Sequence, residues 1–152
     1  MKNVTEELQR IVADYSNKIS SIPEKEFSAK PLPNKWSKKE VLGHLIDSAQ
    51  SNLRRFVCGQ YENTPPHIVY DQDFWVSANA YNQAKGDHVI QLWQLINYRI
   101  CDILNTMPKD NYNKTCNTGQ LRSLQWLAED YVKHMKHHLN QIIPNSFDVV
   151  YK

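Results

Sequence analysis

The sequence predicts an all-α protein, a four-helix bundle with a long loop between its second and third helices. Only four of the 152 residues are glycine, and the seven prolines fall between segments with apolar periodicity. In those segments apolar residues recur at steps of three and four, the spacing of one face of an α-helix. No segment has a clear strand pattern, and no internal repeat is present. We therefore expect residues 1–152 to form one helical-bundle domain.

Composition excludes several classes of protein. Hydrophobic residues make up 41% of the chain and charged residues 22%, as in ordinary globular domains, and the net charge is only +2. So small a charge predicts no nucleic-acid partner. Neither a signal peptide nor an apolar stretch of about 18 residues is evident, so no membrane partner is expected. The cysteines Cys58, Cys101 and Cys116 form no CxxC pair, which favours reduced thiols and a cytoplasmic location.

The first two helices have clear boundaries. The first is expected from about Val4 to Ile19, with Pro23 as its latest end. The second opens with a capping box, in which the hydroxyl of Ser37 accepts from the third helical amide and Glu40 reaches back. Its apolar stripe continues to about Val57.

Residues 59–83 form the long connection. Pro65-Pro66 forbids a helix there, whereas DQDFWVSANAYN predicts a short helix starting at Asp71 or Asp73. Connections this long are often functional. Its aromatic residues could roof a pocket or, more commonly, anchor the loop to the bundle; they are Tyr70, Trp75 and Tyr81.

Two further helices complete the prediction. The third starts near Asp87, interpreted as its N-cap, and runs to about Met107 before Pro108. The fourth runs from about Ser123 to Ile143 and is closed by Pro144. An irregular tail is expected over residues 145–152.

The most informative stretch is YVKHMKHHLNQII. His134 and His138 lie four residues apart, so on a helix they share one face. They continue an apolar stripe that includes Leu127, Tyr131 and Ile142, which predicts a core-facing position. Buried imidazole nitrogens need partners, and a divalent metal ion bound by both side chains would provide one. The alternative is that both are hydrogen-bonded core residues without a metal. His137 lies off this stripe and is expected nearer solvent.

A third ligand is predicted on the second helix. His44 lies at the edge of the apolar stripe, and the small residues Ser48, Ala49 and Ser51 follow it. Three histidines leave a metal position open for water, which is typical of catalytic rather than structural sites and supplies a nucleophile near neutral pH. His67 and His88 lie in polar, loop-like surroundings and are expected to face solvent.

Several other polar residues allow either a functional or a purely structural interpretation. Asp47, one turn after His44, could orient an imidazole or be a surface charge, and Gln141 could line the pocket near His138. For Asp130 the surface interpretation is favoured. Arg54 and Arg55 suit the C-terminal end of a helix through its dipole, or could bind a substrate carboxylate. The general base is not identified.

Two motifs resemble those of a known family. KWSKKEVLGHLIDSAQSNLRRF resembles the first motif of the DinB-like superfamily, in its damage-inducible and bacillithiol S-transferase-related branches, and DYVKHMKHHLNQI resembles its C-terminal motif. Between them, YDQDFWVSANAY and the Leu92-Trp93 region resemble a bacterial subgroup labelled metal-dependent hydrolases. The resemblance covers nearly the whole chain.

The resemblance implies a four-helix bundle with one divalent metal ion, commonly zinc or nickel, held by His44, His134 and His138. Described members include thiol S-transferases, which activate a low-molecular-weight thiol, and proteins called hydrolases. The expected function is therefore a metal-dependent hydrolase or thiol transferase with a small-molecule substrate, although fold and site do not determine the reaction. The alternative is a non-catalytic, metal-binding stress-response module. The oligomeric state is left open, with a homodimer as one option.

Overall fold

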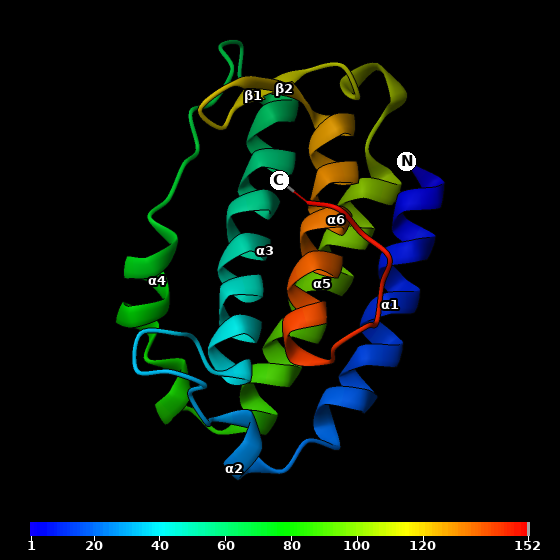
Figure 1. The fold of residues 1–152 in the computed structure, drawn as a ribbon. Coiled ribbons are helices and arrows are strands. Elements are labelled where there is room, and N and C mark those ends of the chain that lie inside the picture. Colours follow the sequence, from blue (N-terminus) through cyan, green and yellow to red (C-terminus); the bar gives the residue numbers. More distant parts are fainter. Residues whose placement is uncertain (152) are drawn as a thin grey trace.

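Four long helices form the bundle in the computed structural model, which describes residues 1–151 (Figure 1). They are α1 (Lys2–Ser20), α3 (Lys38–Tyr61), α5 (Gly86–Thr106) and α6 (Leu124–Ile142). The short helices α2 (Glu24–Phe27) and α4 (Gln72–Asn79) lie outside them. Two 3₁₀ turns complete the helical elements, η1 (Tyr81–Gln83) and η2 (Lys109–Asn111). The predicted four-helix bundle is confirmed.

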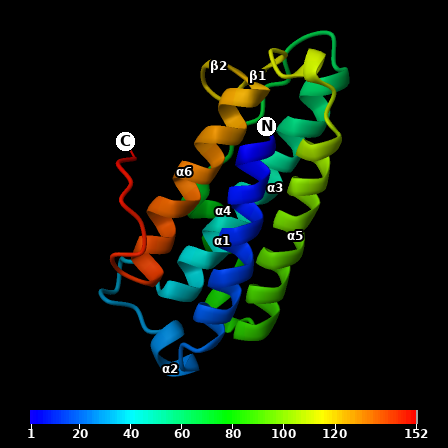
Figure 2. The same cartoon turned by 90° about the vertical axis from the view of Figure 1, so that its right-hand side faces the viewer.

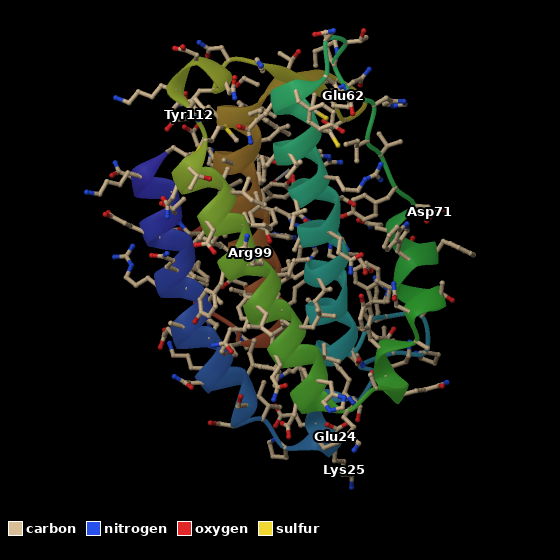
Figure 3. The ribbon with its side chains drawn as sticks, turned by 180° about the vertical axis from the view of Figure 1, so that it is seen from behind. Glu24, Lys25, Glu62, Asp71, Arg99 and Tyr112 are labelled. Carbon is tan, nitrogen blue, oxygen red and sulfur yellow. The ribbon has the colours of Figure 1, made fainter. Side chains whose placement is uncertain are left out.

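The direction of the helices explains the long connection. α1 and α6 run in one direction and α3 and α5 in the other, as Figures 1 and 2 show. Within the bundle α3 contacts α5 and α6, and α1 contacts the same two helices. Because α3 and α5 are parallel, the chain must return along the bundle between them, and residues 62–85 make this return. Figure 3 shows α1 and α5 on the opposite side of the bundle, with Arg99 labelled on α5.

Side-chain caps define several helix starts. The Ser37 hydroxyl accepts a hydrogen bond from the Glu40 amide at 3.1 Å, as predicted. The reciprocal half of the capping box is not formed, because the Glu40 carboxylate pairs with Lys30 at 3.1 Å instead. Asp71 and Ser123 cap α4 and α6 in the same way. The prediction that Asp87 caps the third helix is wrong, because Lys85 is the N-cap residue and Asp87 lies in the first turn. An acidic side chain is still favourable there through the helix dipole.

A small hairpin replaces part of the polar stretch in which no strand was expected. Strands β1 (Thr115–Asn117) and β2 (Leu121–Ser123) pair antiparallel, with Gly119 at a positive φ of 97° in the turn. The long connection stabilises this hairpin, since the Ile68 amide donates to the Asn117 carbonyl at 3.0 Å. Strands of three residues are too short to show a periodic pattern, and a distant segment supplies their support.

α3 is the most buried helix. Its first turns contact α2, α4 and η1 in addition to α5 and α6, so almost every residue from Lys39 to Asn52 is buried. The core around it includes the fully buried Trp93 and Phe56. Among the described residues no helix has the length and hydropathy needed to cross a membrane.

Buried Lys39 links three elements at the start of α3. Only 1% of this residue is exposed; its ammonium group pairs with Glu24 of α2 and donates to the Ala84 carbonyl at 2.9 Å. It also lies over the Phe27 ring, 5.8 Å from the centroid. These contacts join α2 and the end of the long connection to α3.

We expect Lys39→Met to lower the free energy of unfolding by about 2 kcal/mol, because the Ala84 carbonyl and Glu24 lose a buried partner. Urea denaturation followed by circular dichroism measures this loss. Lys38→Met is the matched control, since the Lys38–Glu26 pair involves a half-exposed carboxylate and should change stability by less than about 0.5 kcal/mol. Equal effects of the two variants would contradict the structural role of Lys39.

Candidate metal centre

Three histidine side chains converge between α3 and α6. The Nε2 atoms of His44 and His134 are 3.2 Å apart, and one nitrogen from each of His44, His134 and His138 lies within 4.8 Å of the others. His134 and His138 occupy successive turns of α6, and His44 faces them from α3. The structure thus brings together the three residues that the sequence singled out.

The two histidines of α6 are less buried than the apolar stripe predicted. The core-facing positions of this helix pass through the fully buried Met135 and Leu139, one residue beside each histidine. His134 and His138 therefore lie half-buried at the edge facing α3, whereas His44 is fully buried. This edge position gives the cluster one side in the core and one side toward the surface.

Hydrogen bonds orient the α6 imidazoles. Gln141 Oε1 lies 2.9 Å from His138 Nδ1, and Ser48 Oγ lies 3.5 Å from His134 Nδ1. An amide oxygen accepts from the Nδ1–H tautomer, which leaves the lone pair of Nε2 directed toward the other histidines. Gln141 thus contacts His138 and also lines a pocket, as predicted.

Burial keeps the cluster neutral. Desolvation lowers the pKa of His44 to about 3 and that of His134 to about 2, and it also lowers the pKa of His138. The three side chains therefore present uncharged nitrogens with available lone pairs at neutral pH. In a tetrahedral metal site with bonds of about 2.0–2.1 Å, ligand nitrogens lie roughly 3.3 Å apart, and the 3.2 Å between His44 and His134 agrees with this spacing. The donor set fits a divalent metal ion such as zinc or nickel.

Asp47 differs from the role considered from sequence. Its Oδ1 accepts hydrogen bonds from the Tyr81 hydroxyl at 2.5 Å and from Asn79 Nδ2 at 3.3 Å, and no hydrogen bond joins it to His44. It is fully buried rather than a surface charge, and burial raises its pKa to about 6. Its polar partners thus come from the long connection.

A pocket of about 720 Å³ adjoins the histidine cluster. His138 and Gln141 of α6 form part of its wall, opposite the start of α4. The rest comes mainly from the segment between α2 and α3, whose Trp36 ring also packs 5.0 Å from the His44 ring. The sequence analysis included Trp36 in the motif that carries the family resemblance but did not predict its contact with His44 or its place in a pocket wall. The lining residues with charged side chains are Glu26, Lys30, Lys35, Lys38 and Asp73.

A smaller polar cavity of about 110 Å³ adjoins the Nδ1 edge of His134. Asp130 lines it, half-buried rather than on the surface as favoured, and accepts from the Tyr151 hydroxyl at 3.2 Å. Tyr151 belongs to the irregular tail and had no sequence signal. Arg55 also lines this cavity and donates to the Ile68 carbonyl at 2.8 Å, whereas Arg54 is exposed.

The remaining histidines are not members of the cluster, although the His137 ring lies 4.9 Å from that of His138. His67 and His88 are exposed, and His137 is half-buried, with its ring 5.6 Å from that of Tyr151. Of the aromatic residues of the long connection, Tyr81 anchors it to α3 through Asp47, and Tyr70 and Trp75 pack edge to face at 6.1 Å. None of the three lines the larger pocket, whereas Tyr70 lines the smaller cavity beside His134. All cysteines are free thiols, and none belongs to the cluster.

The lowered histidine pKa values predict a pH-dependent stability of metal-free protein. Below pH 6.5 the unfolded chain binds protons that folded His44 and His134 exclude, so the free energy of unfolding falls as the pH drops. We expect His44→Asn to flatten this slope by about 1 kcal/mol per pH unit, measured by urea denaturation from pH 7 to 5 in a chelator. His88→Asn, at an exposed position, should keep the wild-type slope. An unchanged slope in His44→Asn would contradict the burial argument.

Known proteins share this architecture. The model of the DinB superfamily matches residues 7–142. YfiT of Bacillus subtilis (strain 168) is 22% identical over 138 residues, which cover 89% of this chain and 78% of YfiT. The solved structure of YfiT, described as a probable metal-dependent hydrolase with an unusual four-helix bundle topology, aligns over 93% of this chain and 82% of YfiT at 21% identity, with a TM-score of 0.82.

A second solved structure with a similar fold belongs to a longer protein. The mycothiol-dependent maleylpyruvate isomerase aligns with a TM-score of 0.72 and 12% identity, covering 98% of this chain but 62% of the isomerase. At these identities the solved structures establish the shared fold, and the family model covers most of the sequence. The chain is a member of the DinB superfamily.

Proposed function

We propose that this protein is a metal-dependent enzyme in which His44, His134 and His138 bind one divalent metal ion beside a substrate pocket. The observation that carries the proposal is the convergence of three neutral imidazoles within 4.8 Å, with His138 in the wall of a 720 Å³ pocket. Within the described residues no cysteine or carboxylate joins this group. A tetrahedral ion would therefore keep a position for an exogenous ligand, as in catalytic sites.

Each residue of the cluster has a distinct task in this proposal. His44 supplies a nitrogen from the buried side, and the two histidines of α6 supply theirs from the accessible side. Gln141 holds the His138 imidazole in the tautomer that directs Nε2 inward, and Ser48 Oγ lies 3.5 Å from His134 Nδ1. When bound, the metal supplies Lewis-acid chemistry, which lowers the pKa of water or a thiol and so provides a nucleophile near neutral pH.

The pocket supports a small-molecule substrate. Its volume lies within the usual range for ligand sites, and its wall combines the Trp36 ring and Val41 with charged side chains. Two of its lysines are already paired, Lys30 with Glu40 at 3.1 Å and Lys38 with Glu26 at 2.9 Å. Water or a low-molecular-weight thiol are the two candidate nucleophiles. The name of YfiT supports the first, and the mycothiol dependence of the isomerase supports the second.

We expect purified, untagged protein to contain about one divalent ion per chain, and His138→Ala to lose it, because two imidazoles alone bind weakly. Elemental analysis by mass spectrometry measures this directly. His137→Ala is the matched control, since His137 adjoins His138 but lies outside the cluster. Full metal content in His138→Ala, or none in wild-type protein after zinc or nickel is added, would contradict the ligand assignment.

The nucleophile can be identified with two chromogenic or fluorogenic reactions. Metal-loaded protein should accelerate either the hydrolysis of p-nitrophenyl acetate or the alkylation of cysteine by monobromobimane. We expect His138→Ala to lower the rate of the accelerated reaction at least 100-fold relative to wild type, and His137→Ala to retain the wild-type rate. Loaded protein that accelerates neither probe would favour the non-catalytic metal-binding module.

Gln141→Leu should weaken metal binding about 10- to 100-fold, because the His138 tautomer and ring orientation lose their hydrogen-bond partner. Competition with a zinc chelator of known affinity measures the dissociation constant. Gln94→Leu is a control, since Gln94 lies on α5 and bonds Tyr98 rather than the cluster. Equal affinities of Gln141→Leu and wild type would show that Gln141 does not orient the ligand.

A further inference from the structure

The long connection is fastened to α3 beside the histidine cluster. Tyr81 of η1 is only 6% exposed, and its hydroxyl donates to Asp47 Oδ1 at 2.5 Å. Asn79, the last residue of α4, donates to the same oxygen at 3.3 Å. Both hydrogen-bond donors therefore lie on the long connection, and a single carboxylate of α3 accepts both hydrogen bonds.

Gly43 makes the close approach of Tyr81 to α3 feasible. A Cβ atom at position 43 would overlap the Tyr81 ring, so the ring lies directly on the helix backbone. Gly43 immediately precedes His44, and Asp47 follows one turn later on the same face as Gly43. Tyr81 thus spans the turn of α3 that carries His44.

Asn82 fastens the same 3₁₀ turn to the other wall of the pocket. Its Oδ1 accepts from the Ser37 hydroxyl at 2.5 Å, and its Nδ2 donates to the Ser28 carbonyl at 3.2 Å. Residues 28 and 37 bound the segment that supplies most of the pocket lining, and α4 supplies Gln72 and Asp73. Of these adjacent residues of η1, Tyr81 therefore fixes the connection that carries α4 to α3, and Asn82 fixes it to the segment of residues 28–37.

The backbone between these contacts is strained. Ala80 has φ 48° and ψ 46°, the left-handed conformation, which the Cβ atom of alanine disfavours. Such conformations persist where surrounding contacts hold them. Here the turn allows Asn79 and Tyr81 to reach the same carboxylate, so the contacts of Asp47 account for the strain.

We propose that Asp47, Tyr81 and Asn82 form a clamp that sets the separation of the two pocket walls and hence the size of substrate admitted. Asp47 is then a positioning residue that acts through Tyr81, not through His44. The role in substrate choice rests on the function proposed above, whereas the clamp itself rests on the contacts of the described residues. The clamp residues are not metal ligands, so an experiment can refute the clamp and the metal site independently of each other.

Hydrogen–deuterium exchange tests the clamp in the full chain. We expect Tyr81→Phe, Asp47→Ala and Asn82→Ala each to raise exchange at least tenfold in both residues 28–37 and residues 72–84. α1 and the interior of α5 should keep wild-type exchange. Asp47→Asn retains an oxygen for Tyr81 and should restore near-wild-type protection. Tyr98→Phe, which removes a hydroxyl on α5, is the control and should change neither segment.

Cobalt binding separates the two roles of Asp47. If Asp47 acts through Tyr81, Asp47→Ala and Tyr81→Phe should bind Co²⁺ with the same dissociation constant within about threefold, and with wild-type visible spectra. Cobalt binding weakened more than tenfold in Asp47→Ala alone would assign Asp47 to His44 and overturn the proposal. Faster exchange spread over all four long helices would also overturn it, as a general structural effect. A wild-type protein that binds no cobalt would refute the metal centre, and the exchange pattern would still decide the clamp.

Discussion

The antiparallel contact between α3 and α6 is the packing on which the candidate site depends. It sets fully buried His44 against two half-buried histidines on successive turns of the facing helix. Because desolvation lowers their pKa values, the imidazoles stay neutral, and each can offer a nitrogen lone pair to a cation at the point where the three converge. The site is thus built from helices, which hold ligands more rigidly than loops.

The parallel arrangement of α3 and α5 has a second consequence. It requires a long return connection, and this connection places α4 beside the bundle as one wall of the pocket. The segment between α2 and α3 forms the other wall. Buried Lys39 joins α2 and the end of the long connection to α3. Helix direction, rather than loop sequence alone, thus determines where the pocket lies relative to the histidines.

Helix boundaries and the His134–His138 pair were predictable because they depend on local chemistry, whereas the full ligand set with His44 relied on the family resemblance as well. The Ser37 cap and the i, i+4 spacing of His134 and His138 operate within a few residues, and the structure contains both features. Positions that depend on distant partners were not predictable. The hairpin at Thr115–Ser123 is supported by residues 66–68, and Asp47 bonds to Tyr81 across 34 positions.

The sequence by itself determined the helical class, the bundle and the pairing of His134 with His138, because period, capping and spacing are properties of short segments, and the motif around His44 added the third histidine with support from the family resemblance. Tertiary structure alone decided how these parts meet. The buried face of α6 passes through Met135 and Leu139 instead of His134 and His138, because packing against α3 and α1 sets which side is innermost. Likewise the roles of Trp36, Tyr81 and Tyr151 arise only when segments distant in the chain come into contact, since side-chain partners are determined by the packed structure and not by sequence proximity.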